Sequence, residues 1–466
     1  MIDFYNFKHW LMTTTSYSPK TISNVVSRLK RADSILPWYN DEVYVFHLEQ
    51  NKTFQSLSTS VRSQIKKAVK LFFEYNNDEK ENCIENPTDK MKVLSLFSNI
   101  GVAEAYLESS GFHVAVANEL LERRALLYSK IYPNTDMICG DITTKKTFES
   151  IISKSKTIGI DVLIATPPCQ GMSTAGQQNE DDIRNTLICP VIDAIKELKP
   201  KYVFLENVPM LFKTYIIVNS KKTLIIDYIK NSLELLYKIN SYTIDTKNFS
   251  VPQTRERAII LMTLKQRGLK EWILPNEDTE IVTMEKAIGK LPKLDPYITD
   301  VSEEELLRIF PNFYKRKKEA LKISKWHNPP EHVKRQVVAM QHTPTGCTAF
   351  DNEEYKPVKE NGELIKGYHN TYKRQNWNTP AYTVTMDNRK ISSQNNVHPG
   401  RPDGTDENGN IIYSDARTLT LYEIMKIMSL PDDWNIPKDT SEAFLRRIIG
   451  EGIPPLFVKK VFENLK

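Results

Sequence analysis

A cysteine at position 169 follows two prolines, in the run Ala165-Thr-Pro-Pro-Cys-Gln170. The prolines fix the backbone and remove two hydrogen-bond donors, which indicates a thiol positioned in a rigid loop. A lone cysteine is more often a small buried hydrophobe, but the two prolines favour a nucleophile here. The reactive form is the thiolate, so we expect positively charged or hydrogen-bonding groups around Cys169.

A carboxyl group ends the apolar run Val203-Phe-Leu205, because Glu206 follows it directly. A carboxyl at the end of a buried strand is costly unless it has a partner or a task. Burial favours the neutral acid, which could donate a proton at neutral pH. The alternative is a carboxylate that caps the following turn.

Two arginines alternate in Gln253-Thr-Arg-Glu-Arg257, just before the apolar run Ala258-Ile-Ile-Leu-Met-Thr263. An extended backbone would place Arg255 and Arg257 on one face. Two guanidinium groups on one face suit a phosphate or a carbonyl oxygen. A surface ion pair with Glu256 is the alternative interpretation.

The turn after Val93-Leu-Ser-Leu-Phe97 consists mainly of small residues and ends at Gly101. Such a turn lets a cofactor approach the backbone, and an acid after the next strand, Glu119, can accept both hydroxyls of a ribose. Because the turn lacks the pattern GxGxxG, an adenosine-type cofactor is favoured over a dinucleotide. Taken alone, Gly101 is a turn glycine and Glu119 a solvated charge; their combination in register favours the cofactor.

These candidate residues all follow short apolar runs that alternate with helical segments. The runs are typical of buried parallel strands, and the alternation predicts an α/β sheet. Ligands of such sheets lie outside the carboxyl ends of the strands, where the candidate residues stand. The expected strands are 93–97, 114–117, 161–165 and 202–205, with helices at about 120–132 and 186–198.

Three regions of the chain differ in composition and in the secondary structure that their residues predict. Residues 1–85 are predicted to form an N-terminal helical domain, with Ser18 as an N-cap before Pro19. Residues 88–265, completed by 436–466, are predicted to form the α/β domain. Residues 266–435 are rich in Pro, Asn and turn signals and predict a second domain of mostly irregular β character, with a hairpin or loop at 401–410.

The N-terminal helical domain carries several basic residues on its predicted helices. Its aromatic and basic pattern resembles the DNA-clamping domain of tyrosine recombinases, so DNA contact is one interpretation. A solvated basic face on a small bundle is the other. The residues are Lys20, Arg28, Lys30, Arg31, Arg62, Lys66, Lys67 and Lys70.

Composition sets broader limits on the function. The five cysteines are odd in number and form no CxxC pair, so neither a disulfide framework nor a metal site is expected. No apolar run approaches the ~20 residues of a membrane span, and the first residues lack a secretory pattern. We therefore expect a cytoplasmic protein. The net charge of +5 is compatible with a polyanionic partner but does not identify one.

From about Met91 to its end, the chain resembles the cytosine-5 DNA methyltransferases. The runs Pro167-Pro-Cys-Gln-Gly-Met-Ser173 and Glu206-Asn-Val208 at this spacing are highly specific for that family. The other blocks appear in the family's order. They are Phe97-Ser-Asn-Ile-Gly101, Asn118-Glu119, Gly140-Asp141-Ile142, Arg184-Asn-Thr-Leu187, Gln253-Thr-Arg-Glu-Arg257, Arg417-Thr-Leu-Thr-Leu-Tyr-Glu423 with Leu430-Pro-Asp-Asp-Trp434, and Gly450-Glu-Gly-Ile-Pro454.

The resemblance implies a Rossmann-like methyltransferase domain that uses S-adenosylmethionine, and a target-recognition domain at 266–435. The substrate would be a cytosine flipped out of duplex DNA and methylated at C5. Cys169 would add to C6, Glu206 would act at N3, and Arg257 or Arg255 would hold O2 or a flanking phosphate. No metal is needed, and we expect a monomer on DNA that serves restriction-modification or phage defence.

The resemblance also assigns binding residues. The cofactor residues are Phe97, Ser98, Asn99, Ile100, Gly101, Glu119, Leu120, Asp141, Ile142, Pro168, Leu187, Glu451, Gly452 and Ile453; the DNA contacts are Gln170, Ser173, Gln253 and Arg255. Phe97 would stack on the adenine, Glu119 would bind the ribose, and Asp141 would accept from the adenine amino group.

Three positions depart from the family pattern. Asn99 and Val102 stand where glycine is usual, and Glu451 stands where asparagine is usual. Asparagine tolerates left-handed backbone geometry, whereas Val102 would narrow the approach to the methionine moiety and Glu451 would lie near the cofactor's charges. These changes bear on cofactor affinity more than on reaction type.

Two rival functions fit parts of the same pattern. An RNA cytosine-5 methyltransferase would use the same cofactor and nucleophile, but the Cys-Phe-Thr motif of the tRNA-specific branch is absent. The long segment 266–416 also suits a DNA target-recognition domain. A catalytically weak DNA-binding member is the second rival, and the presence of both Cys169 and Glu206 disfavours it.

Overall fold

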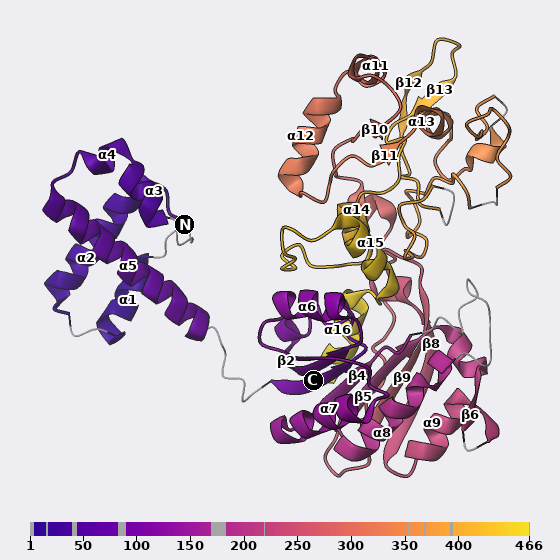
Figure 1. Cartoon of the computed structure of the whole chain (residues 1–466), viewed down its shortest axis with the longest axis horizontal. Coiled ribbons are helices and arrows are strands. Elements are labelled where there is room, and N and C mark those ends of the chain that lie inside the picture. The colour runs from indigo at the N-terminus through magenta and orange to yellow at the C-terminus, as the bar shows by residue number, and fades with distance from the viewer. Residues whose placement is uncertain are drawn as a thin grey trace. The chain divides into compact units, whose positions relative to one another are not determined.

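The computed structural model describes residues 4–14, 17–39, 44–82, 90–168, 183–218, 220–352, 354–367, 370–391 and 395–465. The chain divides into two compact units, Met1–Asp89 and Lys90–Lys466, here named the N-terminal and C-terminal units (Figure 1). Across the described ranges, no helix is both long enough and apolar enough to cross a membrane.

The N-terminal unit is a helical bundle with its own apolar core. As predicted, Ser18 caps the second helix by accepting from Thr21 N, and Pro19 occupies the first turn. Apolar residues at helical spacing fill the core, among them Ile22 and Leu29 with Ile65 and Phe72. The helices are α1 (Phe4–Thr14), α2 (Pro19–Ile35), α3 (Tyr44–Gln50), α4 (Lys52–Gln55) and α5 (Thr59–Asn82).

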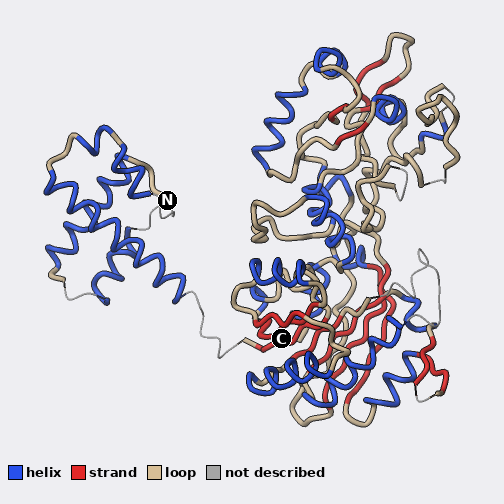
Figure 2. The backbone as a smooth tube through the Cα atoms, viewed as in Figure 1, coloured by secondary structure: helices blue, strands red, loops and turns tan. Residues whose placement is uncertain are grey.

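A seven-stranded sheet of order β3-β2-β1-β4-β5-β9-β8 forms the centre of the C-terminal unit (Figure 2). The first five strands in that order are parallel, which confirms the predicted α/β sheet. β9 pairs antiparallel with β5, and β8 pairs antiparallel with β9, which the sequence analysis did not foresee. The strands are β1 (Met91–Leu96), β2 (Phe112–Glu119), β3 (Asp136–Cys139), β4 (Val162–Ala165), β5 (Tyr202–Asn207), β8 (Tyr237–Asp245) and β9 (Glu256–Leu264).

Both faces of this sheet are covered, because side chains alternate along each strand. On β1, Leu94 and Leu96 join a core with α7 (Lys145–Ile158), α8 (Ile188–Leu198) and α9 (Ile225–Leu233). Val93 joins a second core with the last helix, α16 (Pro455–Glu463). The last helix therefore packs on the sheet whose first strand along the chain is β1. Also around the sheet lie α6 (Glu122–Ile131) and the hairpin β6 (Tyr215–Val218) with β7 (Lys221–Leu224).

The remaining region combines short strands, irregular loops and helices. The predicted turn at 401–410 is confirmed as the antiparallel pair β12 and β13. The elements are α10 (Met284–Ile288), β10 (Tyr297–Ile298), α11 (Glu303–Ile309), α12 (Phe313–Ile323), β11 (Glu331–His332), α13 (Lys334–Gln341), β12 (Pro402–Thr405), β13 (Ile411–Tyr413), α14 (Leu421–Ile427) and α15 (Glu442–Glu451).

Candidate active site and cofactor site

The predicted nucleophile loop begins at the end of β4. Cys169, Gln170 and Ser173 lie outside the described residues, so the loop is defined here by its first residues. The Pro167 carbonyl accepts from Asn207 Nδ2 at 3.1 Å, and Thr166 Oγ1 donates to the Phe97 carbonyl at 3.2 Å. The residues that lead to Cys169 are thereby joined to the ends of β5 and β1.

Glu206 has an arginine partner. Arg257 Nε lies 2.7 Å from Glu206 Oε1, and the two side chains are 13% and 12% exposed. The contact follows from strand register, because Glu206 faces Ile259 across the β5–β9 pair and Arg257 lies two residues earlier on the same face. A nearly buried carboxyl group is thus held in place by a guanidinium group. The two groups could together stabilise charge on a bound ring.

Arg255 and Gln253 have a different environment from Arg257. Arg255 is 2% exposed, and it donates from Nη1 to the Val384 carbonyl (2.7 Å) and from Nη2 to the Gly450 carbonyl (3.0 Å). Gln253 is fully buried, and its Oε1 accepts from Val384 N. Arg255 precedes β9, so it does not share the orientation of Arg257. Their burial argues against the expected DNA contacts of both residues and against the catalytic role of Arg255. It favours a structural role, in which both residues hydrogen-bond to the backbone of segments distant in sequence.

The turn after β1 has the geometry that a close backbone approach requires. Phe97, Asn99 and Gly101 have φ angles of 58°, 53° and 82°. A Cβ on Gly101 would lie 2.1 Å from the ring of Tyr132, whose hydroxyl donates to the Gly101 carbonyl at 2.6 Å. The left-handed conformation expected for Asn99 is therefore present, and Gly101 is required both by its φ and by its neighbour.

Glu119 connects this turn to α6. Its Oε2 accepts from Asn99 N at 3.0 Å and its Oε1 from Leu121 N at 2.9 Å, and the residue is 6% exposed. It is therefore not the solvated strand-end charge of the alternative interpretation. Each carboxylate oxygen has a further lone pair, so Glu119 retains acceptors for ribose hydroxyls.

The other predicted cofactor residues are distributed around the same edge of the sheet. Asp141 is exposed, and its Oδ1 accepts from the amide (2.9 Å) and the hydroxyl (2.7 Å) of Thr143. Leu120 is 59% exposed. Ser98, Ile100, Ile142 and Ile453 are buried, and Pro168 and Leu187 are partly buried.

Val102 and Gly452 fit one another. A Cβ on Gly452 would lie 2.7 Å from Val102 Cγ1, so Gly452 leaves room for the valine. Val102 is 2% exposed and packs with α14 and α15 in an apolar cluster. The expectation that Val102 narrows the cofactor's approach is therefore not what its packing favours, because its side chain contacts the last block.

Glu451 forms an ion pair that the sequence analysis missed. Arg124 Nη2 of α6 lies 2.8 Å from Glu451 Oε2, and Arg447 Nε lies 3.6 Å from Oε1. Among the residues that the structure describes, Asn99 Oδ1, Arg124 Nε and Glu451 Oε1 are buried without a hydrogen-bond partner. These groups comprise a donor and two acceptors, which suits the carboxylate and ammonium of a methionine moiety. The site therefore fits S-adenosylmethionine.

A buried acid, Glu104, lies just after the turn that follows β1. Glu104 is 3% exposed, accepts a hydrogen bond from Ser95 Oγ, and has a second oxygen without a hydrogen-bond partner among the described residues. Burial raises the pKa of Glu104 to about 7. The sequence around Glu104 has no pattern that separates it from an exposed helical acid, so it was not among the predicted residues.

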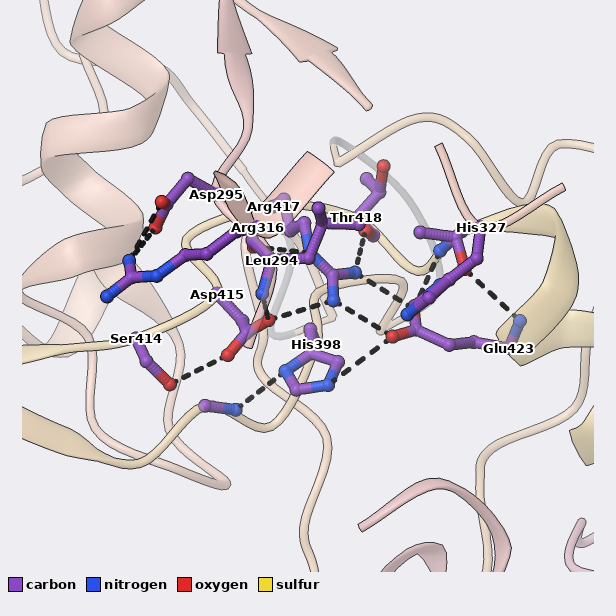
Figure 3. A network of polar contacts seen from close by, with 12 residues as sticks. Leu294, Asp295, Arg316, His327, His398, Ser414, Asp415, Arg417, Thr418 and Glu423 are labelled. Atoms are coloured by element: carbon purple, nitrogen blue, oxygen red, sulfur yellow. Dashed lines mark hydrogen bonds and ion pairs between the residues drawn. The ribbon is translucent and has the colours of Figure 1, made fainter. Parts of the chain in front are cut away.

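The late block, Arg417–Glu423, is structural in this fold (Figure 3). The fully buried Arg417 donates to Asp415 Oδ1 (2.8 Å) and to both oxygens of Glu423 (2.9 Å each), and from Nε to the Leu294 carbonyl. Burial alone would raise the pKa of Glu423, but Arg417 holds it well below its usual range. Burial lowers the pKa of the adjacent His398 to about 4. The network fixes α14, which packs with α15 beside the cofactor turn.

Comparisons with known proteins agree with this arrangement. The family model described as C-5 cytosine-specific DNA methylase matches residues 91–466. The chain is 43% identical over 379 residues to the Type II methyltransferase M1.HgaI of Avibacterium volantium, covering 80% of this chain and 97% of that protein. It is 26% identical over 375 residues to the Type II methyltransferase M1.HphI of Haemophilus parahaemolyticus, covering 79% and 85%.

A solved structure supports the fold. The crystal structure of a DNA modification methyltransferase encoded within a prophage (E. coli) is similar, with a TM-score of 0.53 at 17% identity, and the match covers 81% of this chain and 98% of that one. The chain thus belongs to the C-5 cytosine-specific DNA methylase family, and it is a DNA (cytosine-5-)-methyltransferase that uses S-adenosylmethionine.

Proposed function

We propose that methyl transfer in this chain proceeds through a covalent bond between Cys169 Sγ and C6 of a cytosine flipped out of duplex DNA. The observation that carries the proposal is the Glu206–Arg257 pair at 2.7 Å. It lies at the end of β5, the strand next to β4, which leads into the loop of Cys169. A nucleophile and a charge-stabilising pair on neighbouring strand ends suit addition to an electron-poor ring.

The residues then act in sequence. The Cys169 thiolate forms the bond to C6 while the C5–C6 double-bond electrons shift toward N3 and O2. Glu206 hydrogen-bonds or protonates N3, and Arg257 stabilises the charge on O2. C5 becomes nucleophilic and would form the bond to the methyl carbon as the bond from that carbon to the sulfonium sulfur breaks, which leaves S-adenosylhomocysteine. Loss of the C5 proton to a base and expulsion of the thiolate restore the ring.

S-adenosylmethionine supplies the electrophilic methyl group on a sulfonium. We propose that Phe97 and Asp141 hold its adenine, that Glu119 accepts from its ribose, and that Asn99, Arg124 and Glu451 hold its methionine end. The contacts of Glu119 and the unpartnered atoms of the other three support this arrangement.

The domains follow from these roles. We propose that 88–265 with 436–466 carries the chemistry, that 266–435 recognises the target sequence, and that 1–85 is a separate helical domain. M1.HgaI and M1.HphI are both named Type II methyltransferases, which supports a role in a restriction-modification system. The enzyme would act in the cytoplasm as a monomer on double-stranded DNA.

Bisulfite sequencing of DNA from a host that expresses the enzyme first identifies the methylated cytosine. The test then uses a duplex that carries 5-fluorocytosine at this position. Fluorine replaces the proton that a base must remove from C5 after methyl transfer, so in the presence of S-adenosylmethionine we expect a covalent complex with the wild-type enzyme and none with Cys169→Ser. The Cys169→Ser variant should retain DNA binding and lose methyl transfer. An active Cys169→Ser enzyme would refute the covalent route, and methylation of RNA in place of duplex DNA would refute the substrate.

A further inference from the structure

Within the N-terminal unit, the segment that forms the helical core carries an excess of basic residues. Residues 4–75 contain ten Lys or Arg and five Asp or Glu, a net charge of +5. The rest of the unit, residues 1–3 and 76–89, contains six Asp or Glu and one Lys, so Met1–Asp89 as a whole is neutral and its charges are separated along the chain. This basic segment also lies outside residues 91–466, which the family model matches. The catalytic fold therefore does not account for this basic segment.

The outer face of α2 carries cations without carboxylates. Its inner face buries Ile22, Val25, Leu29 and Ala32. The one acid of the helix is Asp33, whose Oδ1 accepts from Trp38 N at 2.8 Å beyond the helix end. The outer face combines cations with hydroxyl and amide groups over about 17 Å. Its residues are Lys20, Ser23, Asn24, Ser27, Arg28 and Arg31.

Helix α5 packs against α2 and repeats the pattern. Ile65, Ala68, Val69 and Phe72 are buried, which turns the intervening cations outward. Of these, Lys66 pairs closely with Glu49 (2.7 Å), and Lys70 lies 4.0 Å from Glu74 with both side chains at least half exposed. The outward cations of α5 are Lys66, Lys67 and Lys70, whereas Arg62 is partly buried with a buried Nε.

Phosphate groups of nucleic acids are bound by this set of groups, namely Arg and Lys with Ser and Asn side chains. Duplex DNA offers one negative charge per ~1.7 Å of axis, so a basic face of this length meets several phosphates. DNA is also the substrate of the C-terminal unit, and a second contact on the same chain gains from a high effective concentration. A membrane surface would require apolar side chains among the cations, and the outer face of α2 has none.

We propose that the outer faces of α2 and α5 bind the phosphate backbone of duplex DNA without reading its sequence. The N-terminal unit thereby holds the enzyme on the DNA that the C-terminal unit methylates. The inference relies on DNA as the substrate, which family membership establishes, and not on the covalent route through Cys169.

The test compares two full-length triple variants that remove equal charge. Lys20→Gln/Arg28→Gln/Arg31→Gln changes α2, and Lys145→Gln/Lys146→Gln/Lys154→Gln changes exposed lysines of α7 as a control. Binding to a mixed-sequence duplex of about 30 base pairs is measured by fluorescence anisotropy between about 50 and 200 mM salt. Three lost phosphate contacts reduce the slope of log K against log salt by about 2.7, so the affinity loss over this range shrinks by roughly 40-fold. The α7 variant should keep the wild-type slope.

The outcomes separate the inference from its alternatives. Equal slopes for the α2 variant and the wild type, or the same decrease in the α7 variant, would overturn it. So would a decrease seen with polyglutamate but not with duplex DNA, because the partner would then be an acidic protein. Circular dichroism reports folding, and Lys66→Gln/Lys67→Gln/Lys70→Gln on α5 carries the same expectation if the α2 variant does not fold. An enzyme that binds DNA with the expected slopes but forms no covalent complex would refute the proposed mechanism alone.

Discussion

Replacing Glu104 by glutamine should stabilise the protein at neutral and alkaline pH. The carboxyl is 3% exposed and accepts from Ser95 Oγ, and burial raises its pKa to about 7 from 4.5. A folded-state pKa above the unfolded value means that the folded state binds the proton more tightly. Stability is therefore lost as the pH rises from 4.5 to about 7. The difference corresponds to about 3 kcal/mol.

Glutamine preserves the shape and the acceptor for Ser95 but cannot ionise, so the Glu104→Gln variant escapes this loss. Urea unfolding at about pH 5 and about pH 8 should give similar stabilities for both proteins at the lower pH. At the higher pH the variant should be more stable by about 3 kcal/mol. A stability difference that does not change between the two pH values would refute the reasoning.

Glu108 provides a matched control from the same segment. Although burial tends to raise the pKa of Glu108, hydrogen bonds from His113 and Lys90 lower it overall. A depressed pKa contributes stability above the unfolded value and loses it as the pH falls. Glu108→Gln should therefore remove stability at the higher pH, with a sign opposite to that of Glu104→Gln. The same sign for both variants would show that neither effect arises from the local environment.

Two further predictions concern the proposed site. Arg257→Ala should lower the rate of single-turnover methyl transfer by roughly 10²–10³-fold, because it removes the charge beside Glu206. A rate within threefold of the wild type would contradict the role of Arg257. Arg255→Ala should instead lower the melting temperature, because Arg255 is buried. Glu451→Asn should weaken binding of S-adenosylhomocysteine by roughly 10-fold in calorimetry, because the amide still accepts from the ammonium but lacks the negative charge of the carboxylate. The same variant should bind 5′-methylthioadenosine, which lacks the amino acid end, like the wild type, and equal losses for both ligands would refute the placement of Glu451.

The sequence predicts those parts of the fold that depend on a local pattern of neighbouring residues. A buried parallel strand has an apolar run and a polar end, so β1, β2, β4 and β5 and their terminal residues could be recognised. The hairpin at β12–β13 follows from its Asp-Gly and Asn-Gly turns. The antiparallel placement of β8 and β9 could not be read in this way, since a strand's own residues do not specify its neighbour.

The arginines show why site residues are harder to predict than strands. An extended chain places Arg255 and Arg257 on one face, but the backbone near Gln253 bridges to Ala381, and Thr254 N donates to the Ala381 carbonyl. This contact, far along the chain, turns Arg255 into the interior while Arg257 joins Glu206. The burial of Glu104 has the same origin, because Glu104 follows β1 whereas the nearby Tyr128 and Tyr132 come from α6 and the residue after it.

The departures from the family pattern are better understood in pairs than one by one. Val102 occupies space that Gly452 leaves, and the Glu451 carboxylate lies against Arg124. Asn99 Nδ2 reaches the Ile448 carbonyl at 3.5 Å, so each unusual residue of the first block or the last has its counterpart across the same contact. A substitution to the usual residue at one position alone would leave its counterpart without packing or without a charge partner. Each unusual residue is therefore fitted to a different neighbour, namely the space at Gly452, the guanidinium of Arg124 or the Ile448 carbonyl.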